Sequence, residues 1–129
     1  MFGANDGGIE QINPDTARSD GYLITEEELG GDITDFAFVS PERAFAIVSK
    51  PDFTTSLVAF DPTTRSVTQT LVSNGNLSDI ELDSRGQLFL ADRNPSKPGI
   101  RIFRASDGVE LTSAPLDLGL PPFDIVFVP

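Results

Sequence analysis

Short runs of β-branched and aromatic residues alternate along the chain with clusters of Gly, Pro, Asn and Asp. Such runs are typical of β-strands, and such clusters are typical of the turns that join them. A helix is indicated only at Thr25–Leu29, where a capping-box pattern is followed at once by two glycines, so at most one helical turn is expected. The pattern predicts an all-β protein with strands at Ile9–Asn13, Gly21–Thr25, Ile33–Val39, Ala44–Ser49, Ser56–Asp61, Val67–Val72, Ser78–Asp83, Gln87–Asp92, Ile100–Arg104, Val109–Thr112 and Phe123–Val128.

The strand pattern repeats with a period near 44 residues, the spacing between Asp35 and Asp79. The segment Leu77–Arg93 has an imperfect copy at Ile33–Ser49, and the start of a further copy lies at Phe123–Val128. A period of this length, with several short strands in each unit, is typical of the blades of a β-propeller. The sequence therefore predicts a partial β-propeller.

The strands of a blade are named A to D from the central axis outward, and the chain then reads C-D, A-B-C-D, A-B-C-D, A, or about two and a half to three blades. Residues 1–30 are expected to form half a blade, residues 31–74 and 75–118 one blade each, and residues 119–129 the first strand of the next. Closed propellers generally have at least four blades. We therefore expect either a part of a longer propeller or a ring completed by a dimer of roughly 28 kDa, twice the 13.9 kDa of one chain.

The repeat also resembles a known family. Leu77–Phe103, which contains Ser-Asp-Ile-Glu-Leu-Asp-Ser-Arg-Gly-Gln-Leu-Phe-Leu-Ala-Asp-Arg, is similar to the NHL and YVTN-type propeller repeats of bacterial surface and periplasmic proteins. Ser56–Val67 looks like the matching strand C with its turn, and the phrase from Phe2 to Asp15 is similar to one found in YVTN-like lipoproteins. In Ile33–Ser49, Ser-Pro-Glu-Arg replaces the Asp-x-x-Gly turn of the family. The resemblance implies a propeller fold and a periplasmic or extracellular location in a bacterium.

Composition narrows the range of functions. The net charge of −11 argues against binding to nucleic acid and to anionic lipid, both of which require clustered Lys and Arg. The apolar runs fall well short of the roughly 20 residues needed to span a bilayer. The chain has no Cys and no His, which excludes thiol chemistry, disulfides and serine–histidine catalysis. An enzyme of this composition would depend on carboxylates, on Lys50 or Lys97, on Tyr22, or on a bound hard cation.

Three aspartates provide the first candidate site. Asp35, Asp79 and Asp124 occupy equivalent places near the start of each strand A. In a propeller these carboxylates would surround the mouth of the central channel, where they could hold a hard cation such as Ca²⁺. The alternative is structural, because an Asp at a strand start commonly accepts hydrogen bonds from loop amides.

The loops between strands B and C provide the second candidate site. Lys50, Asp52, Arg93 and Asn94 offer donors and acceptors for a protein or sugar partner, since loops on a rigid scaffold commonly carry binding groups. Ordinary solvated loops, with Asp92 and Arg93 as an internal ion pair, are the alternative. The acidic run Glu26–Glu28 is interpreted as a solvated cluster.

These observations favour a non-enzymatic binding or scaffold module for protein or carbohydrate recognition outside the cytoplasm. The alternative is a cation-dependent propeller enzyme of the lactonase or lyase type, with the three aspartates holding the metal.

Overall fold

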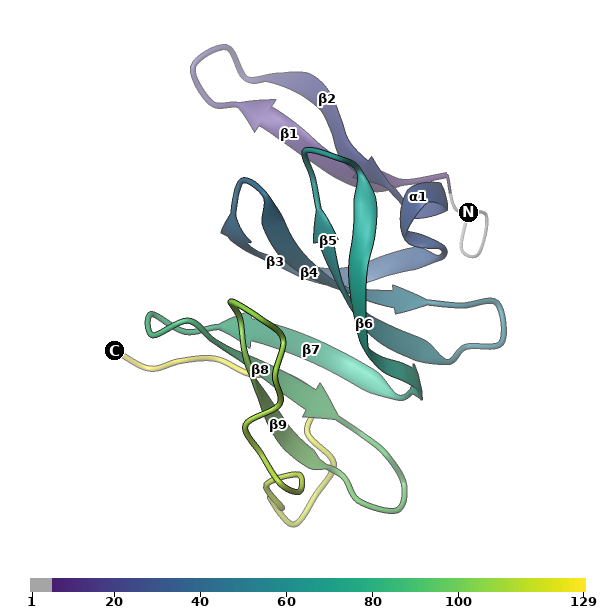
Figure 1. The fold of residues 1–129 in the computed structure, drawn as a ribbon, viewed down its shortest axis with the longest axis vertical. Helices are drawn as coiled ribbons and strands as arrows, with labels where there is room; N and C mark the ends of the chain where they lie inside the picture. Colours follow the sequence, from purple (N-terminus) through teal and green to yellow (C-terminus); the bar gives the residue numbers. More distant parts are fainter. Residues whose placement is uncertain (1–5) are drawn as a thin grey trace.

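Three antiparallel β-sheets follow one another along residues 6–129, the part of the chain that the computed structural model describes (Figure 1). The first sheet pairs β1 (Gly8–Asn13) with β2 (Arg18–Thr25). The second sheet joins, in sequence order, β3 (Asp32–Ser40), β4 (Arg43–Ser49), β5 (Thr55–Asp61) and β6 (Ser66–Gly75). The third sheet contains β7 (Leu77–Leu82), β8 (Gln87–Asp92) and β9 (Gly99–Arg104). The all-β prediction is confirmed.

Two of the predicted strands do not form. In 109–112, Leu111 N donates to Ile102 O at 2.7 Å, but Ile102 N donates to the hydroxyl of Thr112 in place of a backbone carbonyl. This side chain interrupts the ladder beside β9, and isolated bridges remain. The segment 123–128 forms no backbone ladder with any strand among the described residues. The third sheet therefore has three strands where four were expected, and residues 119–129 form no strand.

The turns follow the sequence chemistry. Asn13 Oδ1 accepts hydrogen bonds from Asp15 N (2.9 Å) and Thr16 N (3.3 Å), and Asp61 Oδ1 accepts one from Thr63 N (2.8 Å). The two turns end in the same backbone shape, with φ of 55° at Ala17 and 56° at Arg65. Both hairpins therefore turn at an Asx-Pro pair whose Asx side chain accepts backbone amides.

The helical turn α1 (Glu26–Leu29) has the predicted capping box. Thr25 Oγ1 accepts from Glu28 N at 3.2 Å, and Glu28 Oε1 accepts from Thr25 N at 3.0 Å. Gly30, with φ of 90°, ends the turn in the left-handed conformation. Within residues 6–129, no helix is both long and apolar enough to cross a lipid bilayer.

The core consists of two clusters, one on each side of the second sheet, and β4 contributes side chains to both. Ala44, Ala46 and Val48 pack toward the first sheet, whereas Phe45 and Ile47 pack toward the third. This alternation is the period of two expected of a strand. All three sheets are visible side by side in Figure 1, with the second between the other two. The double burial of β4 explains why its sequence is apolar almost throughout.

Two arginines connect neighbouring sheets through backbone carbonyls. Arg65 Nη1 donates to Tyr22 O at 2.8 Å and so joins the second sheet to the first. Arg43 Nε donates to Ala105 O at 2.6 Å, beyond the end of β9, and the Arg43 guanidinium lies 5.0 Å from the Phe45 ring centre. A guanidinium can bridge carbonyls in this way because its donors are spread over a rigid plane.

Candidate functional site

Asp35 and Asp79 each accept a hydrogen bond from the backbone of the following repeat. Asp35 Oδ2 accepts from Ile80 N at 2.9 Å. Asp79 Oδ2 accepts from Ile125 N at 2.7 Å, one period further along the chain. Because the same contact occurs twice between equivalent positions, these carboxylates act as connectors between successive repeats. This geometry supports the structural interpretation of the aspartate series.

The three aspartates also affect one another. Burial is the main cause that raises the pKa of Asp79 to about 7, and the neighbouring side chains of Asp35 and Asp124 contribute in the same direction. The hydrogen bond from Ile125 N opposes the rise. The structure therefore brings the three predicted residues together, as the spacing indicated. Among the described residues, however, no group of three or more His, Cys, Asp or Glu side chains is arranged to hold a metal ion.

Lys50 and Asp52 lie in the loop between β4 and β5, where both take part in the turn. Lys50 N donates to Thr54 O at 2.9 Å, and Asp52 Oδ1 accepts from both the amide (2.9 Å) and the hydroxyl (2.6 Å) of Thr54. These bonds from Thr54 lower the pKa of Asp52. Lys50 also lines a hollow of about 240 Å³ that includes Ser56, whose buried hydroxyl has no hydrogen-bond partner.

Arg93 and Asn94 begin the loop after β8, and both are engaged within the chain. The Arg93 guanidinium lies 5.2 Å from the centre of the Phe123 ring. Asn94 Oδ1 accepts from Ser96 N at 2.8 Å, which closes the loop on itself. The internal ion pair of Asp92 with Arg93, given as the alternative, does not form, since Asp92 instead binds Arg101 at 3.2 Å. The predicted loop residues are thus largely occupied by local structure.

The acidic run 26–28 is not simply solvated, which corrects the sequence interpretation. Glu26 accepts from Gly7 N at 2.9 Å and from Ile33 N at 3.0 Å, so its carboxylate connects the residue before β1 with β3. Glu28 forms an ion pair with Arg65 at 2.6 Å. The hydrogen bond from Arg65 is the main cause that lowers the pKa of Glu28 to about 2. Glu26 and Glu28 thus make specific contacts at the surface, where Glu27 and Glu28 remain exposed.

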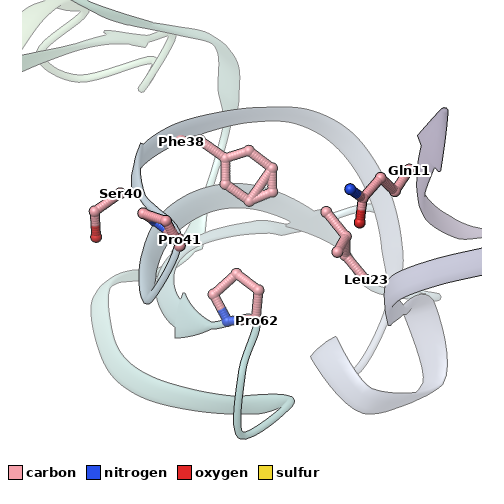
Figure 2. Close-up of a pocket in the computed structure, with 6 residues that line it drawn as sticks. All are labelled: Gln11, Leu23, Phe38, Ser40, Pro41 and Pro62. Carbon is pink, nitrogen blue, oxygen red and sulfur yellow. The ribbon is translucent and has the colours of Figure 1, made fainter. Parts of the chain in front are cut away.

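Sequence reasoning missed an apolar pocket of about 350 Å³ between the first and second sheets. Figure 2 shows Leu23, Phe38, Pro41 and Pro62 around this hollow, with the amide of Gln11 at its edge; Ser40 completes the lining. The Phe38 ring meets Phe60 edge-on at 6.2 Å on one side, while 38% of its surface stays exposed. An apolar hollow with few polar groups is suited to a hydrophobic side chain.

The pocket is open because the first sheet has two strands where the second has four. Between the second and third sheets, Phe45 and Ile47 of β4 help to bury Ile80, which is 2% exposed. Phe36 holds the place of Ile80 one repeat earlier, yet it is 46% exposed. In the described part of the chain no strand precedes β1, so no strand there covers Phe36 as β4 covers Ile80 between the second and third sheets.

The free edge of β1 borders this pocket through Gln11. Among the described residues β1 pairs with β2 alone, so the backbone groups along its other side are available to a further strand. Comparison of the chain with protein-family models, with curated proteins and with solved structures finds no match.

Proposed function

We propose that this chain is a non-enzymatic binding module, with the three sheets arranged as blades of a partial β-propeller, and that its ligand is an extended segment of protein. The pattern C-D, A-B-C-D, A-B-C-D, A remains part of the proposal, with the third D strand and the last A strand present as irregular segments. The periplasmic or extracellular location, which follows from the family resemblance, is part of it as well.

The observation that carries the proposal is the apolar pocket beside the open edge of β1. A segment added next to β1 would form a backbone ladder with it, and its alternate side chains would enter the pocket, which is the general mode of strand addition. The interface between the second and third sheets supports this reading, because β4 fills the equivalent place there with Phe45 and Ile47.

A protein ligand fits this surface better than a carbohydrate. Sugars are recognised through many directed hydrogen bonds, but the pocket offers Gln11 and Ser40 as its polar side chains. The polar loops that were first considered for sugar binding have their groups engaged in turns, as at Asp52 and Asn94. The aspartates considered for a cation-dependent enzyme accept backbone amides.

The proposal is tested with a labelled peptide that copies residues 41–51 of this chain, Pro-Glu-Arg-Ala-Phe-Ala-Ile-Val-Ser-Lys-Pro, which contains β4. We expect saturable binding by fluorescence anisotropy. A peptide with Asp in place of the Phe and Ile should not bind, because neither side chain could enter the apolar pocket.

The matched variants locate the site. Phe38→Ala should weaken binding about tenfold or more, as the loss of a central aromatic contact does at other interfaces. Leu118→Asp, at a remote position that is 60% exposed, should leave binding unchanged. Equal binding by all three proteins, with each folded by circular dichroism, would rule out this pocket as the site.

A further inference from the structure

The hydrogen bond that the aspartate of one repeat accepts from the amide of the next has no counterpart before Phe36 or after Asp124 within residues 6–129. Ile80 and Ile125 each donate their amide to the aspartate of the preceding repeat. The equivalent amide in β3, Phe36 N, donates to Asp35 at 2.8 Å, just as Ile125 N also donates to Asp124 at 2.9 Å, but no aspartate of an earlier repeat reaches it within residues 6–129. At the other end Asp124 has no later repeat to connect in the described structure.

The side chains around these two groups are apolar and exposed. Phe36 and Phe38 form one such face, and their rings are 6.0 Å apart in an edge-on contact. On the other end, Val126 is 83% exposed and Val128 is 89% exposed. Inside the chain Ile80, the equivalent of Phe36, is covered with 2% exposure, and Ala37, the equivalent of Val126, packs against the same core cluster. The face at Phe36 therefore lacks an aspartate and an apolar cover from an earlier repeat, and segment 123–128 carries both groups in Asp124 and Val126.

The segment 123–128 already lies in the position of a first strand. Ile125 is bonded to Asp79, and the Phe127 ring meets Phe89 of β8 edge-on at 5.1 Å. One side of the segment is thus fixed on the third sheet, whereas Val126 and Val128 are exposed. Inside the chain, β7 lies against β3 in the corresponding way.

We propose that segment 123–128 of one copy docks on β3 of a second copy, so that Asp124 accepts the amide of Phe36 and Val126 covers the Phe36 ring. The contact continues the interface that the chain already uses between its own sheets. Two such contacts, each joining the tail of one copy to the head of the other, close a dimer.

This arrangement deepens the proposed function and rests on it for the nature of the ligand. In the order β3-β4-β5-β6, the docked segment takes the place of β3, and β1 takes the place of β5. Paired strands are about 4.8 Å apart, so roughly 10 Å separate the docked segment from β1, which leaves room for one strand. The slot for the bound protein segment is then formed by two copies, and it is incomplete in a monomer.

Sedimentation velocity of the chain between 1 and 100 µM tests the contact. We expect wild type to form a dimer, and Phe36→Asp and Val126→Asp each to be monomeric. Leu118→Asp, which adds the same charge away from both faces, should remain a dimer. A wild-type monomer at 100 µM, or an open series of larger species, would overturn the closed dimer.

Mixing the two monomeric variants separates a lost contact from a lost fold. Each mixed pair retains one intact head, from Val126→Asp, and one intact tail, from Phe36→Asp. We expect the mixture to recover a dimer at 100 µM. Two folded variants that stay monomeric when mixed would contradict head-to-tail docking.

The copied β4 peptide distinguishes failure of this inference from failure of the proposed function. We expect Val126→Asp, whose own pocket is intact, to bind the peptide at least tenfold more weakly than wild type. Unchanged binding by Val126→Asp would overturn the shared slot and leave the pocket as the site. A wild-type dimer that does not bind the peptide would overturn the proposed function and leave the docking contact in place.

Discussion

Asp79 has a carboxylate neighbour on each side, and this environment changes how it titrates. Its side chain is 9% exposed, between Asp35 and Asp124. A proton held by Asp79 removes the repulsion among these groups and allows one carboxyl to donate to another. At this position, which first suggested a cation site, a proton can reduce the repulsion among the three carboxylates as a bound cation would.

The raised pKa has a consequence for stability. Because the pKa of Asp79 rises from 3.8 to about 7 on folding, the folded chain keeps this proton more firmly than the unfolded chain does. The resulting stability is fully present below pH 4 and is lost as the pH rises through 7, with a slope of at most about 1.4 kcal/mol per pH unit.

Urea unfolding of wild type and Asp79→Asn between pH 4.5 and 8 measures this effect. Asn is neutral at every pH and still accepts the Ile125 amide, so the variant should lose the dependence and be the more stable protein at pH 8. Asp20→Asn, at an exposed position, is the control and should follow wild type. Parallel curves for wild type and Asp79→Asn would contradict the assignment.

At the scale of elements, local pattern was sufficient wherever a strand had neighbours in the chain. The apolar run in 43–49 and the Asx-Pro pairs after β1 and β5 marked the correct hairpins. The same kind of pattern failed for 109–112 and 123–128. A strand forms only where its backbone can pair with a neighbouring strand. Residues such as Val126 favour extended backbone, but this preference does not provide the neighbouring strand.

The two matching turns allow a test at this scale. Ala17 has φ of 55°, a left-handed conformation that costs a residue with a β-carbon about 1 kcal/mol. Ala17→Gly should therefore raise the free energy of unfolding by roughly 0.5–1 kcal/mol. Ala114→Gly, at an exposed position without positive φ, should bring no gain. A loss of stability in Ala17→Gly would show that the turn is not strained.

At the scale of the whole molecule, the repeat predicted the places of the aspartates but not the pocket. The spacing of Asp35 and Asp79 is a property of the sequence, and it places them in line once the sheets stack. The pocket at Phe38 depends on strands that do not precede β1 in the described structure, so no residue pattern marks it. The pocket follows from the size of the first sheet, which has two strands in the described structure and leaves Phe36 and Phe38 of β3 partly exposed.

The position of β4, enclosed on both faces, sets the order in which the molecule opens. Solvent reaches a backbone amide there only if both flanking sheets move away, so hydrogen–deuterium exchange should be slowest in β4 and β5. Exchange should become faster outward, toward β1 on one side and residues 105–129 on the other. Uniform rates along the chain would mean that the three sheets unfold as one unit. A gradient would mean that the outer sheets unfold locally while β4 and β5 stay folded, so that the surfaces near both ends can still bind a partner.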